Sequence, residues 1–323
     1  MDKTARTPES LLDAVRFFAD PDVCLTFLAS RRWPDGNVKC PICGSREVTF
    51  LSEYRRWKCR TKHPRQQFSI KVGTIFEDSP IGLDKWLPAV WMLVNDKNGI
   101  SSYEVARALD VTQKTAWFML HRIRLAMQDG SVEKLRGRVV ADETFIGGKV
   151  RNMHKKRRMK VMGRRRSGRI GADGTHHKTI VMGMLERGGE VRTEIIRDVD
   201  TPTLQRVVRA NVESGAAVLT DACQSYRQLA PDFVHRYVNH MSEYVRGHVH
   251  TNTIENFWSL LKRAIKGTYV NVEPFHLRRY VDEQSFRFNK RFLTDGDRFV
   301  SALRRIVGRR ITYKALTTAA ATT

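Results

Sequence analysis

The chain has 323 residues, and its 57 Lys and Arg against 34 Asp and Glu leave a formal net charge of +23. Such an excess favours polyanionic partners, above all nucleic acid, whereas an apolar share of 41% is that of a globular protein rather than a disordered basic tail. No apolar run approaches the roughly 18 residues that cross a bilayer, and the first ten residues lack the apolar stretch of a secretory signal. Membrane and secreted proteins are therefore excluded, and we expect an intracellular protein that binds nucleic acid.

Composition divides the chain into four parts. Residues 1–75 contain most of the cysteines, and residues 76–130 have apolar residues at the spacings of three and four that are typical of helices. Residues 131–290 alternate β-rich runs with amphipathic helical patterns. Residues 291–323 are basic and end in the small-residue run TTAAATT, which we expect to be frayed.

The cysteines of the first part have metal-ligand spacing. Cys40 and Cys43 flank Pro-Ile, and after fifteen further residues Cys59 is followed by His63. Two such pairs can close a tetrahedron around one Zn²⁺ ion, with Gly44 relieving the tight turn. Four ligands leave no open position, so the predicted site is structural rather than catalytic. The alternative is a set of ordinary buried cysteines.

Residues 99–124 have the pattern of a helix-turn-helix. Ser101 or Ser102 caps the first helix, Asp110 and Val111 make the turn, and Thr112 caps the second helix. The N-terminal end of a second helix of this kind enters the major groove of DNA. We predict that this end contacts DNA through Gln113, Lys114, Thr115 and Trp117. The alternative is a helical hairpin within a hydrophobic core.

The stretch Lys149–Arg169 holds eleven Lys and Arg and no acid. A charge run of this kind is usually a solvated loop, but this one lies inside the part of the chain that also carries the candidate catalytic acids. A basic loop beside an active site binds phosphates without reading the base sequence. We predict DNA-backbone contacts from Lys155, Lys156, Arg157, Arg158, Arg164, Arg165 and Arg166.

The third part is predicted to be a mixed α/β domain. Arg-Gly-Gly joins two strand-like runs in a hairpin turn, and Thr201 is expected to cap the helix that follows. Three strands, a helix, two strands and two helices are expected in turn at 136–150, 176–186, 190–200, 201–214, 216–222, 235–240, 253–265 and 276–291. This order indicates a layered fold in which helices cover a central sheet.

Three acids of this domain are candidate metal ligands. Asp142 and Asp221 are each expected at the end of a strand, and Glu255 lies on a helix. Carboxylates so arranged can hold two Mg²⁺ (or Mn²⁺) ions for phosphoryl transfer, with Asp142 bridging both. Lys262, two helical turns after Glu255, can reach a DNA phosphate. Trp258 is expected to pack in the core rather than to stack on bases. Taken singly, each acid is more often a surface residue or a helix cap.

These motifs carry a resemblance to a known family. The chain resembles an insertion-sequence transposase of the DDE superfamily, in the branch with an N-terminal zinc ribbon. The resemblance spans residues 38–291 and rests on CPICGS, QFSIKVGTIFEDSPIGLDKW, ADETFIGGK, VLTDACQSY, HTNTIENFWSLLKR with the following GTY, and YVDEQSFRFNKR. The zinc pattern departs slightly, because Cys59 and His63 stand where Cys-x-x-Cys is commoner.

The resemblance implies a ribonuclease-H-like catalytic fold, preceded by a zinc ribbon and a helix-turn-helix. It implies metal-dependent cleavage of double-stranded DNA at transposon ends and strand transfer into target DNA. The catalytic acids of the family map onto Asp142, Asp221 and Glu255, and the adjacent lysine maps onto Lys262. In part of this branch Asn replaces the third acid. Here that acid is present as Glu255, which favours an active enzyme. A bacterial, cytoplasmic and nucleoid-associated protein is expected, at least a homodimer when two DNA ends are paired.

Two other functions remain open at this point. A nuclease or Holliday-junction resolvase shares the fold and the metal ions but stops after hydrolysis. A non-enzymatic DNA-binding regulator would use only the zinc ribbon and the helix-turn-helix. The three acids, all present, argue against the regulator, and a strand-transfer product distinguishes a transposase from a nuclease.

Overall fold

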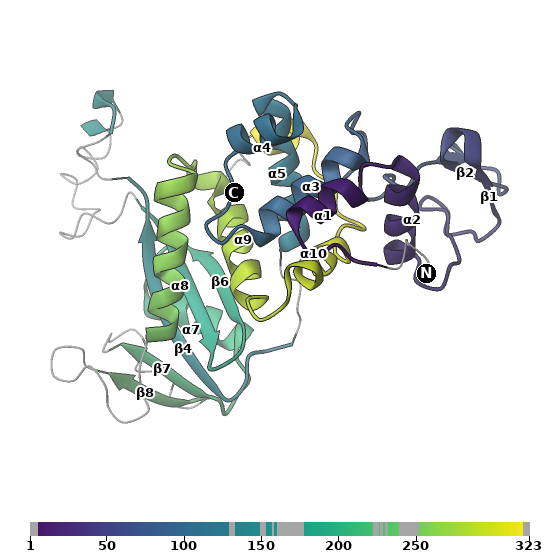
Figure 1. Ribbon diagram of the computed structural model, residues 1–323. Coiled ribbons are helices and arrows are strands. Elements are labelled where there is room, and N and C mark those ends of the chain that lie inside the picture. Colours follow the sequence, from purple (N-terminus) through teal and green to yellow (C-terminus); the bar gives the residue numbers. More distant parts are fainter. Residues whose placement is uncertain are drawn as a thin grey trace. The chain divides into compact units, whose positions relative to one another are not determined.

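The computed structural model describes residues 6–128, 133–148, 153–156, 158–159, 178–221, 226, 229, 232–238 and 252–318 (Figure 1). At Asp221, Tyr237, Val238 and Asn252 it describes the backbone alone. The chain forms two compact units, the first comprising Met1–Asp129 with Lys290–Thr323 and the second comprising Gly130–Asn289. The C-terminal segment therefore belongs with the N-terminal unit.

Two helices that the sequence analysis did not predict precede the cysteines. Helix α1 spans Leu11–Phe17, and the side chain of Ser10 caps it by accepting from the Asp13 amide. Helix α2 spans Pro21–Arg32, and its proline is suited to the first turn, where a backbone N–H has no helical partner. Both helices are short, so their apolar periodicity is weak and local caps define them better than the pattern does.

The zinc-ribbon region is a small antiparallel sheet in the order β1-β2-β3. Strands β1 (Val48–Leu51) and β2 (Arg56–Cys59) are joined by the 3-10 turn η1 (Ser52–Tyr54), and β3 is Gln67–Phe68. The buried ring of Trp57 lies 5.4 Å from Trp33 and 5.9 Å from Phe68. So small a sheet has little other apolar surface, which is why a metal is expected to stabilise it.

The remaining helices of the first unit are α3 (Leu83–Asn95), α4 (Ser102–Leu109), α5 (Gln113–Met127), α10 (Asp295–Leu303) and α11 (Tyr313–Thr317). The fully buried Phe299 of α10 joins the first helices to α3, with ring centres 5.7 Å from Phe18, 6.1 Å from Phe27 and 5.2 Å from Trp91. The basic C-terminal segment therefore completes the hydrophobic core of the first unit.

The second unit is built on a mixed five-stranded sheet in the order β6-β5-β4-β7-β8. Its strands are β4 (Arg138–Ile146), β5 (Thr179–Glu186), β6 (Val191–Ile196), β7 (Ala217–Asp221) and β8 (Val234–Val238). The first three are antiparallel, and β7 and β8 run parallel to β4. Three antiparallel strands with two parallel strands beside the first form a ribonuclease-H-like sheet, as the family resemblance implied.

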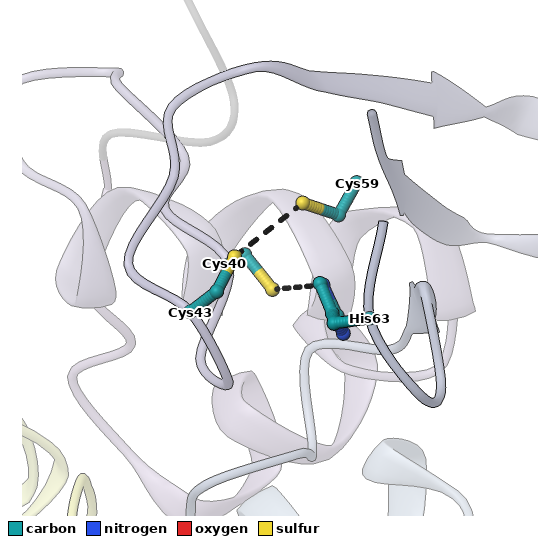
Figure 2. A group of neighbouring side chains, drawn as sticks. All are labelled: Cys40, Cys43, Cys59 and His63. Atoms are coloured by element: carbon teal, nitrogen blue, oxygen red, sulfur yellow. Dashed lines mark hydrogen bonds between the residues drawn. The ribbon is translucent and has the colours of Figure 1, made fainter. Parts of the chain in front are cut away.

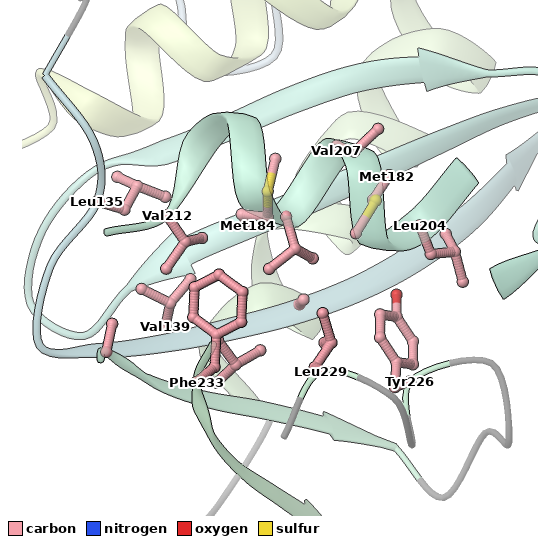
Figure 3. Close-up of a cluster of buried hydrophobic side chains, with 14 of the residues drawn as sticks. Leu135, Val139, Met182, Met184, Leu204, Val207, Val212, Tyr226, Leu229 and Phe233 are labelled. Atoms are coloured by element: carbon pink, nitrogen blue, oxygen red, sulfur yellow. The ribbon is translucent and has the colours of Figure 1, made fainter. Parts of the chain in front are cut away.

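Helices cover both faces of this sheet. Helix α7 (Thr201–Asn211) packs on the face of Val139 and Ala141 (Figure 3). Helices α8 (Asn252–Arg263) and α9 (Leu277–Asn289) pack on the face of Val140, and two short turns, Ala264–Thr268 and Pro274–His276, lie between them in the chain. Because strand side chains alternate, Asp142 shares the face of Val140 and Glu143 shares the face of Ala141.

Two details of the sequence prediction were wrong. Thr201 is not the helix cap: α7 begins at Thr201, and Asp200 is the cap residue. Asp142 does not end its strand but lies in the middle of β4, because β5 continues to pair with β4 as far as Ile146. The hairpin between β5 and β6 was predicted correctly, and Gly188 has the positive φ of 76° that its turn requires.

Candidate metal centres and DNA-contacting elements

The four predicted zinc ligands lie together (Figure 2). Their ligand atoms are all within 4.8 Å of one another, with Cys43 Sγ 3.6 Å from Cys59 Sγ and Cys40 Sγ 3.5 Å from His63 Nε2. A tetrahedral Zn²⁺ ion has S···S edges of about 3.8 Å and S···N edges of about 3.6 Å, from its usual bond lengths. The donor set and its spacing therefore fit one structural Zn²⁺ ion with a Cys₃His shell.

Neighbouring backbone orients these ligands. His63 Nδ1 lies 2.7 Å from the Pro64 carbonyl, a contact that makes Nδ1 the donor and directs Nε2 toward the sulfurs. Burial raises the pKa of Cys59, but hydrogen bonds from His63 and Cys43 outweigh it and bring that pKa down to about 7. The thiolate is the form that binds a metal, so a lowered thiol pKa suits a metal ligand. Gly44 has a φ of +75°, so the turn after Cys43 suits glycine.

The helix-turn-helix is present, with the predicted caps. Ser101 and Glu104 form a reciprocal capping box at α4, and Thr112 accepts from the Thr115 amide at α5. Asp110 adopts the left-handed conformation in the turn between them. The Lys85 ammonium, on α3, donates to the Asp110 carbonyl at 2.9 Å and fixes the turn. Helices α3, α4 and α5 thus form one three-helix element.

The residues predicted to contact bases have partners within the first unit. Gln113 Nε2 donates to Ser102 Oγ at 2.8 Å, and the Thr115 hydroxyl lies 2.9 Å from that of the cap residue. The exposed Lys114 ammonium lies 4.7 Å from the ring centre of Tyr313, at the start of α11. A DNA duplex that bound this helix end would compete with these contacts. DNA contact by these residues stays a prediction.

The basic segment Lys149–Arg169 lies largely outside the described residues. The structure describes Lys155, Lys156 and Arg158, and all three are exposed. Arg157 and the predicted contacts Arg164, Arg165 and Arg166 lie outside the described residues. The prediction of phosphate contacts therefore rests on the charge pattern of the sequence.

Asp142 is held from the face of the sheet that α8 covers. The indole Nε1 of Trp258, on α8, donates a hydrogen bond to Asp142 Oδ2 at 2.8 Å. Trp258 is 4% exposed and belongs to the hydrophobic cluster between the sheet and α8. Its core packing is as predicted, whereas its contact with Asp142 was missed, because a tryptophan at helical spacing carries no sequence signal for a carboxylate partner.

Asp142 and Asp221 occupy matching positions on neighbouring parallel strands. The last registered pair of β4 and β7 is Val140 with Leu219. Two residues further along each strand come Asp142 and Asp221, and β7 ends at Asp221. The side chain of Asp221 lies outside what the structure describes. Continued by these two residues, the register aligns the backbone positions of two acids that are 79 residues apart in the chain (221 − 142).

The other two candidate catalytic residues lie on α8, which packs against β4 and β5. Glu255 is exposed and stands one turn before Trp258, whose side chain contacts Asp142. Lys262 is exposed two turns after Glu255. Among the described side chains, only the Cys-His group brings three or more metal-binding atoms close together, so the three-acid centre stays a prediction.

Glu143, the acid next to Asp142, has a different environment. The hydroxyl of Tyr226 donates a hydrogen bond to Glu143 Oε1. Tyr226 is fully buried in the hydrophobic cluster on the α7 side of the sheet. Strand alternation and this contact together assign Glu143 to the opposite face from Asp142.

The polar motif YVDEQSFRFNKR forms a buried network on α9. Glu283 is fully buried and pairs with Arg287, and the Tyr269 hydroxyl also donates to Glu283. Asn289 accepts from the Val191 amide at 2.7 Å and donates to the Val191 carbonyl at 2.9 Å, so its side chain pairs with the sheet edge as a strand would. The motif therefore attaches α9 to β6.

None of the helices in the described ranges combines the length and apolarity that a membrane span requires.

The comparisons with known proteins point to DNA transposition. A family model described as an ISXO2-like transposase domain matches residues 134–289, and one described as a transposase zinc-ribbon domain matches residues 20–61. The first match contains all four candidate catalytic residues, and the second contains the three zinc-site cysteines.

Two relatives are informative. An uncharacterized protein in the transposable element ISH50 of Halobacterium salinarum is 30% identical over 258 residues, which are 77% of this chain and 84% of that protein. An uncharacterized transposase-like protein of Haemophilus influenzae is 31% identical over 101 residues, which are 31% of this chain and 81% of that protein. The ISH50 match extends over both units of the chain, because 258 residues are more than either unit contains.

Proposed function

This chain belongs to the zinc-ribbon branch of the DDE insertion-sequence transposases, and from this premise we propose that it cleaves DNA at the ends of its element and joins the freed ends to target DNA. Water would open the phosphodiester at each element end and release a 3′-hydroxyl. That hydroxyl would then attack a phosphodiester of the target, displacing one target strand end. No protein side chain becomes covalently attached to DNA in this scheme.

The observation that carries the proposal is the register of β4 and β7. Continued by two residues beyond its last pair, Val140 with Leu219, this register would set Asp142 beside Asp221, and the helix that packs on β4 carries Glu255. Carboxylate oxygens are the preferred ligands of Mg²⁺ and Mn²⁺, and the surrounding chain is strongly basic, as a DNA-acting enzyme requires. Glu143 is the nearest rival acid, and its partner Tyr226 lies on the other face.

Asp142, Asp221 and Glu255 would hold two divalent cations. When bound, such ions neutralise charge at the phosphoryl group and activate the attacking oxygen. Trp258 holds the Asp142 carboxylate through its indole N–H. Lys262, exposed on α8, would bind a phosphate of the DNA strand and orient it.

The first unit would recognise the element ends. Its zinc ribbon and three-helix element would be the DNA-contacting modules, and the N-terminal end of α5 carries Gln113, Lys114 and Thr115. The basic segment Lys149–Arg169 would add contacts to the DNA backbone that do not depend on sequence. Because two ends must be joined to one target, we propose that two or more copies of the chain act together.

The test uses a supercoiled plasmid that carries the DNA flanking this gene on both sides. Purified full-length protein with Mg²⁺ should produce breaks at the element ends and, with a second plasmid present, covalent joint products. The Asp142→Asn variant should produce neither while still binding the same DNA. Breaks without joint products would identify a nuclease or resolvase, and binding without breaks would identify a regulator.

A further inference from the structure

Trp258 is attached to Asp142 in a way that hydrophobic packing alone does not require. The indole Nε1 donates to Asp142 Oδ2 at 2.8 Å although the ring is 4% exposed and surrounded by apolar side chains. A phenylalanine or leucine would fill an apolar space of this kind without placing a donor in it. The tryptophan thus directs one buried N–H at the carboxylate in the middle of β4.

The strand beside Asp142 is shaped to receive this indole. Gly183 on β5 is the cross-strand partner of Asp142. A Cβ atom added at Gly183 would lie 2.6 Å from both Cζ2 and Cη2 of Trp258, closer than non-bonded carbon atoms approach. The φ of Gly183 is not in the left-handed region, so the backbone does not require glycine there. Close contact with the indole is therefore what requires glycine at this position.

We propose that Trp258 is a positioning residue for the metal-binding carboxylate of Asp142, and that Gly183 provides the space that lets it act. The hydrogen bond limits rotation of the carboxylate and sets the direction in which its oxygens face the cations. It also connects β4 to α8 one turn from Glu255, so two ligands from distant elements are held in register. This inference rests on the proposed function, because it takes Asp142 as a metal ligand.

The first test removes the donor and keeps a ring. In the zinc-loaded, full-length protein, Trp258→Phe should weaken binding of Mn²⁺, measured by electron paramagnetic resonance, by about 10- to 100-fold, the usual effect of losing a hydrogen bond to a metal ligand. The Mg²⁺ concentration for half-maximal cleavage should rise in parallel. DNA binding should be retained, because neither partner is a phosphate contact.

The second test displaces the indole without changing either hydrogen-bonding residue. Gly183→Ala should weaken Mn²⁺ binding as Trp258→Phe does, because the new methyl group occupies the space of the indole ring. In the Trp258→Phe background the same substitution should add little, since a phenyl ring lacks the two atoms that clash. Equal losses in both backgrounds would contradict the proposed role of Gly183.

A third measurement observes the hydrogen bond without any metal. The full-length protein contains six tryptophans, and ¹⁵N-labelling of tryptophan gives one indole N–H signal for each. The signal that disappears in Trp258→Phe should be the one that shifts most in Asp142→Asn. If Asp142→Asn left that signal in place, the hydrogen bond would not exist in solution and the proposal would fail.

The matched control is Phe257→Leu. Phe257 is fully buried, with its ring centre 5.0 Å from that of Trp258, but its side chain has no hydrogen-bond donor for Asp142. This variant should lower the melting temperature and leave Mn²⁺ affinity unchanged. The proposal is overturned if Trp258→Phe behaves in the same way. If Asp142→Asn itself leaves Mn²⁺ binding unaltered, the metal site of the proposed function fails instead, which is a separate outcome.

Discussion

The zinc-ribbon ligands and the three acids proposed to bind catalytic metal ions are two sets of residues of opposite construction. Cys40, Cys43, Cys59 and His63 lie within 24 consecutive residues (63 − 40 + 1), and their ligand atoms lie within 4.8 Å of one another. The three acids come from two strands and a helix, and 114 residues span them (255 − 142 + 1). The first set depends on local turns, whereas the second depends on the packing of the whole second unit.

This difference predicts how each set of ligands responds to substitution of one of its residues. A local centre contributes most of the stability of a small module, so loss of one ligand should unfold the module around it. The second unit, whose packed elements carry the acids, has a hydrophobic core of its own. Loss of one acid should therefore remove the chemistry and leave the fold intact. The four predictions below follow from this contrast.

The largest expected effect is at the zinc ribbon. Cys43→Ser should abolish zinc binding and unfold residues 38–70, because structural zinc contributes on the order of 10 kcal/mol to modules of this size. Zinc content measured on the full-length protein should fall from one ion per chain to none. Limited proteolysis should then cut within the ribbon and leave a stable fragment that contains the second unit.

The control for this prediction is Cys24→Ala. Cys24 is a fully buried thiol outside the ligand set, and burial raises its pKa to about 12, which disfavours the metal-binding thiolate. The variant should retain one zinc ion. A full complement of zinc in Cys43→Ser would remove Cys43 from the ligand set.

The next effect is at the catalytic acids. Asp142→Asn, Asp221→Asn and Glu255→Gln should each lower the rate of DNA cleavage by about 10³-fold or more, since a bound metal ion contributes several kcal/mol to the stability of the transition state. The melting temperature and DNA affinity should be retained. Cleavage assays with Mg²⁺ and with Mn²⁺ provide the measurement.

Glu143→Gln is the matched control, because it changes the adjacent acid on the opposite face of β4. Cleavage at a normal rate is expected. If Glu143→Gln were as inactive as Asp142→Asn, the assignment of the acids to faces would be wrong.

A smaller effect is expected where packing supports the acid centre. Glu283→Gln leaves the buried Arg287 guanidinium without its carboxylate, and breaking a buried ion pair from one side costs about 3–5 kcal/mol. The free energy of unfolding, from denaturant titration, should fall by that amount. The same substitution at Glu213, whose side chain is 53% exposed and pairs with Arg136, should cost less than about 1 kcal/mol. Equal costs at both sites would contradict the role assigned to the α9 network.

The smallest effect concerns the basic segment. Changing Lys155, Lys156 and Arg158 together to Gln should weaken binding to all DNA sequences alike. The slope of log affinity against log salt should become shallower by about 0.9 for each DNA phosphate that the variant no longer binds. Preference for element ends over random duplex should survive, because base reading is assigned to α5. An unchanged slope would mean that these three residues do not bind phosphates.

Local signals in the sequence predicted much of this molecule. The spacing of Cys40, Cys43, Cys59 and His63 was sufficient for the zinc site, because a metal site made from two tight turns requires little beyond those turns. The helix starts at α4 and α5 were also predictable, because the caps at Ser101 and Thr112 depend only on residues adjacent in the chain. Alternating and helical periodicity predicted the elements of the second unit in the correct order.

Tertiary structure decided what depends on partners distant in the chain. The position of Asp142 within β4 follows from continued pairing with β5, which no local pattern encodes. Helix α10 forms in a basic segment because Phe299 packs into an aromatic core made by the N-terminal helices. The contact of Trp258 with Asp142, across Gly183, exists only once α8 has packed on the sheet. Amino-acid types determine which chemistry is available, but the free energy that brings these side chains together comes from burial between elements, which only the folded chain provides.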